Sequence, residues 1–143
     1  MVLTWSAGGV TLAFAVRPDA PVALLSVRPA SEPKAHLLST GPPLVEIQAV
    51  GHGRFPGSHR YADTTTGARL RYQHHAAADD ELRIVQADPV TGLVATSVFQ
   101  AVGDVAAVRT WTEVTAEEPV QLQAVTSVVT GAFLLDADRA VDQ

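Results

Sequence analysis

Residues 88–131 read DPVTGLVATSVFQAVGDVAAVRTWTEVTAEEPVQLQAVTSVVTG, and this stretch decides the fold class. It contains runs rich in Val, Thr, Ala and aromatic residues, namely Leu93–Ala101, Val105–Thr115 and Val120–Thr130. Gly103-Asp104 separates the first run from the second, and Glu117-Glu118-Pro119 separates the second from the third. Runs of β-branched residues divided by short turn sequences are typical of consecutive antiparallel strands. The stretch therefore predicts an antiparallel meander and almost no helix.

The residues before this stretch add further strands. We expect them at Val10–Val16, Val22–Val27, Val45–Val50, Leu70–His74 and Glu81–Ala87. In the third of these, Val45, Ile47 and Ala49 alternate with a second set that begins at Glu46. In the fourth, Leu70, Tyr72 and His74 fall on one side at period two. No segment longer than about ten residues has the apolar spacing of a helix. About nine short strands predict an all-β chain folded as an antiparallel β-sandwich.

Composition excludes several classes of function. The chain has 143 residues, of which 47% are hydrophobic and 17% charged, as in a folded globular domain. The net charge is −5 and the basic residues are scattered, so we expect no nucleic-acid partner. The chain has no cysteine, which excludes disulfides, zinc–thiolate sites and thiol catalysis.

Location and source are predicted from composition as well. No apolar run approaches the roughly 18–20 residues of a membrane span, so we expect no membrane partner. The first five residues lack the pattern of a secretory signal, and we expect a cytoplasmic protein. One lysine stands against nine arginines, with much Ala and Val, which favours a GC-rich bacterial source.

Residues 51–67, GHGRFPGSHRYADTTTG, form the most irregular segment. Glycines, histidines, arginines and aromatic residues occur there without a period. A structureless loop of this length is uncommon unless it is functional or disordered. The aromatic and basic side chains favour a functional loop.

Other polar clusters carry no chemistry that we expect to be used. His74 and His75 are neighbours on a predicted strand and point to opposite faces, so they cannot chelate one ion. The acids at 79–81 and at 117–118 fall in predicted turns, where carboxylates are usually solvated. No G-x-S-x-G elbow is present. The residues themselves thus predict no metal, no cofactor and no catalytic group.

Residues 91–131 resemble the N-terminal β-sandwich of the α-galactosidases of glycoside hydrolase family 36, the melibiase type. The order of the preceding elements is similar too: a strand, the loop 51–67, GARLRYQHH at 67–75 and an acidic hairpin. The resemblance covers residues 3–133 and implies a supersandwich of the galactose-mutarotase type. The family's domain is longer than this chain, so we expect a partial domain over 1–133 and a frayed acidic tail over 134–143.

The resemblance implies a parent enzyme that hydrolyses terminal α-galactosides, such as melibiose or raffinose, with retention. The family places its two catalytic aspartates in a (β/α)₈ barrel, which needs about 250 residues and is absent here. We therefore carry over no catalytic residue and expect this chain to be inactive alone. Its implied partners are that barrel, the sugar bound through the parent enzyme, and other copies in a homo-oligomer.

Candidate substrate-binding residues lie in the loop. In the family the corresponding loop reaches toward the sugar pocket and presents an aromatic residue, often Trp, near the position of Phe55. An aromatic ring suits the C–H face of a sugar, and polar side chains can bond its hydroxyls. The predicted set is Phe55, Arg54, His52, Arg60 and Tyr61. The alternative is that Phe55 and Tyr61 pin the loop to the sandwich while the charged groups are solvated.

Two other classes of function stay open. A stand-alone carbohydrate-binding module would need an exposed aromatic platform, for which Trp111 beside Arg109 is a candidate. A sandwich that only scaffolds an oligomer would need no ligand. We expect Trp111 to lie in the core or at a domain interface, and Trp5 to serve packing.

Overall fold

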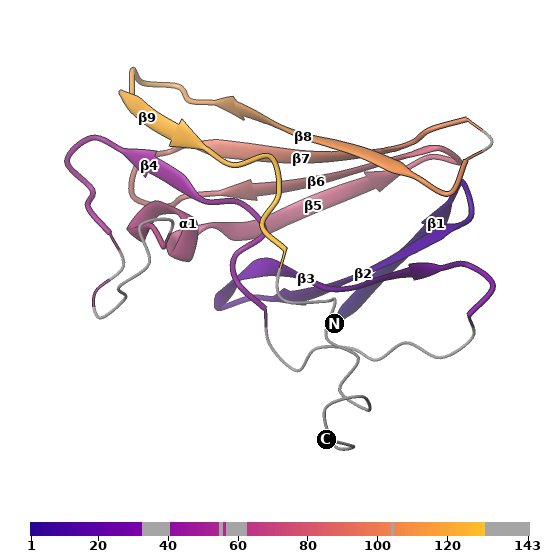
Figure 1. Cartoon of the computed structure of the whole chain (residues 1–143). Coiled ribbons are helices and arrows are strands. Elements are labelled where there is room, and N and C mark those ends of the chain that lie inside the picture. Colours follow the sequence, from indigo (N-terminus) through magenta and orange to yellow (C-terminus); the bar gives the residue numbers. More distant parts are fainter. Residues whose placement is uncertain (33–40, 55, 57–62, 104, 131–143) are drawn as a thin grey trace, which may run out of the picture.

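The computed structural model describes residues 1–32, 41–54, 56, 63–103 and 105–130 (Figure 1). Antiparallel strands make up most of this part of the chain, with one short helix. The elements are β1 (Val2–Ala7), β2 (Val10–Arg17), β3 (Ala20–Pro29), β4 (Ile47–Ala49), α1 (Thr65–Arg69), β5 (Arg71–Ala77), β6 (Glu81–Ala87), β7 (Val94–Ala101), β8 (Val108–Thr115) and β9 (Leu122–Val125). The predicted all-β sandwich is confirmed. The predicted tail, 134–143, lies outside the described residues.

The first sheet has the order β1-β2-β3. Strand β1 was not predicted, because its sequence lacks a clear alternation. Gly8 and Gly9 join it to β2 with φ values of 55° and 77°, as a two-residue type I′ hairpin turn requires. Trp5 of β1 is buried in the core, which confirms its packing role. The sheet is therefore an antiparallel hairpin ribbon extended by β3.

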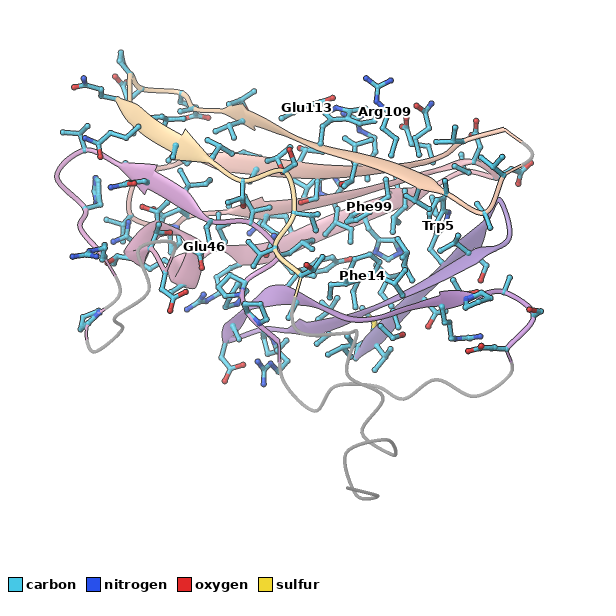
Figure 2. All side chains as sticks on the ribbon, in the orientation of Figure 1. Trp5, Phe14, Glu46, Phe99, Arg109 and Glu113 are labelled. Carbon is cyan, nitrogen blue, oxygen red and sulfur yellow. The ribbon has the colours of Figure 1, made fainter. Side chains whose placement is uncertain are left out.

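The second sheet has the order β5-β6-β7-β8 and packs on the first (Figure 1). Phe14 of β2 and Phe99 of β7 meet between the sheets, with ring centroids 5.1 Å apart and planes at 60° (Figure 2). Leu82, Ile84 and Gln86 of β6 lie on one face at period two, and all three are fully buried. Gln86 Oε1 also accepts a hydrogen bond of 2.8 Å from the backbone N–H of Val22 in β3. Trp5 Nε1 of β1 donates a second bond, of 3.4 Å, to the Ala78 carbonyl in the turn between β5 and β6, so apolar packing and side-chain hydrogen bonds together join the two sheets.

The third run of the 88–131 stretch does not extend the meander, so that part of the prediction was wrong. Strands β7 and β8 pair as predicted, but β9 pairs with β4 (Figure 1). The break at residues 117–119 carries the chain away from the edge of β8. A side-chain bond of 2.7 Å from the Thr112 hydroxyl to the carbonyl of Ser127 links β8 to the residues just after β9. Pairing with β9 supplies the partner that β4 needs.

A β-bulge changes the predicted alternation in β5. The register shifts between Tyr72 and His74, which leaves Gln73 as the extra residue. The common face predicted for Leu70, Tyr72 and His74 therefore ends at Tyr72. The Tyr72 hydroxyl lies 2.7 Å from Nδ1 of His75 instead.

Trp111 does not lie in the core, which corrects one of the two positions expected for it. It is half-buried on the outer face of β8, where the Arg109 guanidinium lies 5.7 Å from its ring centroid. Its Nε1 donates a hydrogen bond of 3.1 Å to Glu113. Figure 2 shows Arg109 and Glu113 pointing away from the first sheet. The opposite face of β8 carries Thr and Val side chains, of which Val108 and Val114 pack against the core.

An apolar cavity of about 220 Å³ opens between the sheets. Its lining includes Leu12, Leu24, Phe99, Val108 and Val128. Sugar sites need several converging polar groups, and this lining is mostly apolar.

In the part of the chain described here, no helix is long and apolar enough to cross a membrane.

Substitution of Phe14 tests the inter-sheet contact. Phe14→Ala removes a fully buried ring, so we expect the free energy of unfolding to fall by about 3–5 kcal/mol, and Ile84→Val by about 0.5–1.5 kcal/mol. Urea titration followed by tryptophan fluorescence measures both. Val90→Ala, at a residue 62% exposed, is the control and should change stability by less than about 0.5 kcal/mol. Equal losses in the core variants and the control would contradict the assigned core.

Candidate functional site at the base of the 51–67 loop

The structure places two of the predicted substrate-binding residues. His52 is half-buried and Arg54 is exposed, while Phe55, Arg60 and Tyr61 lie outside the described residues. Arg54 forms an isolated antiparallel bridge with Thr64. The backbone N–H of Thr65 also donates to the carbonyl of Gly53, at 3.4 Å. The two ends of the loop are therefore paired with each other.

The end of the predicted loop is a helix, so the prediction of a structureless segment to residue 67 was wrong. Helix α1 covers Thr65–Arg69, and Thr64 is its N-cap with φ −102° and ψ 149°. The Thr64 hydroxyl accepts the backbone N–H of Gly67 at 2.9 Å, a common capping arrangement. The sequence signal for the start of this helix was Thr64, since Thr is a preferred N-cap residue. A helix of five residues is not stable alone, so contacts at both ends must hold it.

The first of these contacts is a buried carboxylate. Glu46, directly before β4, is only 4% exposed, and its Oε2 accepts the backbone N–H of Thr64 at 2.9 Å. The Thr64 hydroxyl donates to the same oxygen. A Cβ atom on Gly67 would lie 2.9 Å from Glu46 Cδ, so the close approach of α1 requires glycine at this position. The strand alternation had placed Glu46 opposite the core residues, and its burial was not predicted.

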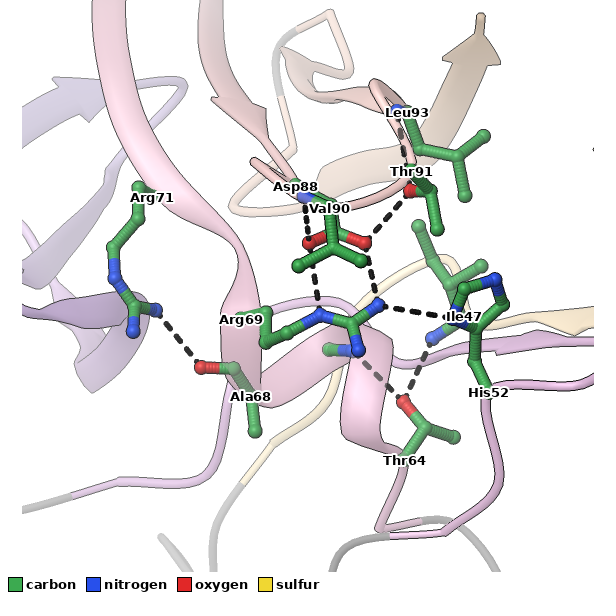
Figure 3. A network of polar contacts seen from close by, with 11 residues as sticks. Ile47, His52, Thr64, Ala68, Arg69, Arg71, Asp88, Val90, Thr91 and Leu93 are labelled. Carbon is green, nitrogen blue, oxygen red and sulfur yellow. Dashed lines mark hydrogen bonds and ion pairs between the residues drawn. The ribbon is translucent and has the colours of Figure 1, made fainter. Parts of the chain in front are cut away.

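The second contact is the Arg69–Asp88 ion pair at the other end of α1 (Figure 3). Arg69 Nε and Nη2 donate to the two carboxylate oxygens at 3.0 and 2.7 Å, and the Asp88 side chain has no exposed surface. Asp88 also accepts the Thr91 hydroxyl at 2.7 Å and the Val90 N–H at 3.2 Å. This carboxylate thus ties α1 to the turn between β6 and β7.

The ion pair shifts the pKa of both groups. Burial of Asp88 by itself raises the pKa of its carboxyl. Hydrogen bonds from Arg69, Thr91 and the Val90 N–H outweigh burial, so this pKa lies below its ordinary value. The hydrogen bond to Asp88 raises the pKa of the Arg69 guanidinium, against a smaller opposing effect of burial. Both groups are therefore charged across the physiological pH range.

His52 joins this network from the start of the loop. Its Nδ1 lies 3.4 Å from Arg69 Nη2 (Figure 3). A guanidinium only donates, so Nδ1 must be the unprotonated nitrogen in this contact. When the ring is neutral, its proton is then on Nε2.

The described residues of this site fix the positions of the chain and include no acid–base pair. Glu46 and Asp88 are buried and accept several hydrogen bonds each, so neither is presented to a substrate. Among the residues that the structure describes, no cluster of three or more His, Cys, Asp or Glu side chains could hold a metal ion. The acidic residues at 79–81 and 117–118 are exposed or partly exposed at the surface. What the site can do chemically is fix the loop ends and orient polar side chains.

Comparison with known proteins adds no assignment. No protein-family model, no curated protein and no solved structure matches this chain.

The Asp88 pair predicts a pH-dependent stability. Asp88→Asn should lower the free energy of unfolding by about 2–4 kcal/mol at pH 7, because Arg69 loses its buried charged partner. The folded pKa of Asp88 lies below its unfolded value of about 3.9. The stabilisation is therefore complete above that value and declines as the pH falls through the folded pKa.

Urea titrations of wild type and variant at pH 7, 5 and 3 measure this difference. It should be similar at pH 7 and 5 and smaller at pH 3. Asp79→Asn, in an exposed turn, is the matched control and should change stability little at any of these pH values. A difference that does not shrink at pH 3 would contradict the role of the Asp88 charge.

Proposed function

We propose that this chain is a non-catalytic N-terminal β-sandwich of an α-galactosidase-like enzyme of glycoside hydrolase family 36. The parent enzyme hydrolyses terminal α-galactosides, such as melibiose or raffinose, in a separate barrel domain. The sequence resemblance over residues 3–133 and the two-layer antiparallel fold support this proposal. We also propose a cytoplasmic location and assembly into a homo-oligomer.

We further propose that the loop 51–67 forms part of the rim of the sugar pocket in the parent enzyme, which we call its pocket-rim role. The single observation that carries this role is the double anchorage at the base of the loop. Glu46 fixes Thr64 at one end of α1, and Asp88 fixes Arg69 at the other. Burying two carboxylates to hold a short surface helix carries a large desolvation penalty, which each carboxylate must offset with several hydrogen bonds. A loop that positions side chains for a ligand requires this kind of fixed base.

Each predicted loop residue has a role in this proposal. Phe55 supplies a flat apolar face for the sugar ring, and Tyr61 extends that face or closes the loop. Arg54 and Arg60 donate hydrogen bonds to sugar hydroxyls. His52 donates through Nε2, because its Nδ1 faces Arg69.

Activity assays and the adjoining coding sequence test the proposal. The purified chain should not release nitrophenol from a nitrophenyl α-galactoside, whereas a family 36 enzyme in the same assay should. The DNA after the codon for Gln143 should encode a (β/α)₈ barrel, in frame or after one frameshift. Turnover by the isolated chain would refute the assignment of catalysis to another domain. An adjoining sequence without a barrel would refute the parent enzyme.

A stand-alone carbohydrate-binding module is the second candidate, because Trp111 lies half-exposed on an outer sheet face. Arg109 and Glu113 occupy positions around its ring, which reduces the area left for a sugar. Galactose titration followed by NMR distinguishes the two proposals. We expect no saturable shifts up to millimolar galactose. Saturable shifts that disappear in Trp111→Ala but persist in Trp5→Phe would favour the module.

A further inference from the structure

Glu46 connects three segments that are distant in sequence. Its backbone N–H donates to the Thr126 hydroxyl at 2.9 Å, and its carbonyl accepts the Thr126 N–H at 3.0 Å. Its side chain turns the other way and accepts two bonds from Thr64, eighteen residues along the chain. Glu46 is thus fixed by the end of β9 and in turn fixes the end of the loop.

The Thr64 hydroxyl uses its complete hydrogen-bonding capacity in this contact. It donates to Glu46 and accepts the backbone N–H groups of Ile47, at 3.2 Å, and of Gly67, at 2.9 Å. A hydroxyl has one donor and two acceptor positions, so all three are filled. Thr64 is 3% exposed, and water cannot easily replace any of these partners. Displacing Thr64 would remove two hydrogen bonds from the buried Glu46 carboxylate and take this acceptor from the Ile47 and Gly67 N–H groups, which is strongly unfavourable.

We infer that Glu46 is a positioning residue, which through Thr64 sets where the chain leaves the sandwich at Gly51 and returns at Asp63. Gly67 is part of the same device, because only a residue without a side chain admits the Glu46 carboxylate beside α1. The positioning of the loop ends deepens the pocket-rim part of the proposed function and does not itself require a ligand. Its consequence for sugar binding rests on the proposed function.

Amide hydrogen exchange by NMR on the full chain tests the inference. The reporters are the N–H groups of Ile47, Thr64 and Gly67, compared with core N–H groups of β6 and β7. Glu46→Gln replaces the charged acceptor by a weaker neutral one, and the Thr64 N–H should exchange about tenfold faster. Thr64→Val keeps the shape but removes the hydroxyl, and the Ile47 and Gly67 groups should exchange roughly ten- to hundredfold faster.

Two matched variants separate positioning from general stability. Thr64→Ser keeps the hydroxyl and should stay within about threefold of wild type at all three reporters, as rescue of the valine variant. Ile84→Val lowers global stability, so exchange of the core N–H groups should become faster. The ratio of reporter to core exchange rates should stay as in wild type. If Thr64→Val does not fold, Glu46→Gln and Thr64→Ser decide the matter.

The outcomes are distinct from those of the functional proposal. Unchanged reporter exchange in folded Glu46→Gln would overturn the inference, and so would reporters that change only in proportion to the core groups. Neither result affects the assignment of the chain to a non-catalytic sandwich. Conversely, α-galactoside hydrolysis by the isolated chain would remove the functional proposal and leave the exchange result valid.

Discussion

The contact of Phe14 with Phe99 between the two sheets is the interaction on which the rest of the structure depends. Each sheet has one apolar face, and those faces are stable only when they are buried against each other. The edge-to-face geometry of the two rings, 5.1 Å between centroids, sets the spacing of the layers at this point. The surrounding Leu, Ile and Val side chains fill the same layer. The two sheets, their turns and the contacts that fix the ends of the 51–67 loop are built around this apolar layer.

Polar contacts hold β4 and α1 in place at one end of the sandwich, where apolar packing alone is not enough. Strand β4 is short, and α1 has a single turn, so neither has enough apolar area to hold its place alone. Two buried carboxylates, Glu46 and Asp88, supply directional bonds instead. Hydrogen bonds have preferred lengths and angles, whereas apolar contacts are not directional. The anchors therefore determine the positions of the loop ends more closely than packing would.

Much of the fold could be predicted from the sequence, because the patterns that specify individual strands are local. Strands β2, β3, β6 and β7 follow from alternating or β-branched runs bounded by turn residues. The partner of β9 could not be predicted, because an alternating run does not specify which free edge it will pair with. The bulge at Gln73 and the outward position of Trp111 could not be predicted from the sequence either, since each depends on register against a neighbouring strand.

For the candidate site, the sequence by itself determined that residues 51–67 are rich in glycine, aromatic and basic groups. It also determined the class of fold, because period-two patterning is a property of each strand alone. Only the tertiary structure decided that Glu46 is buried and that Thr64, Arg69 and Asp88 anchor the loop. A carboxylate on a strand looks solvent-facing in any alternating pattern. The Thr64 hydroxyl bonds the buried Glu46 and the Arg69 guanidinium bonds the buried Asp88, and the fold brings both partners from elsewhere in the chain.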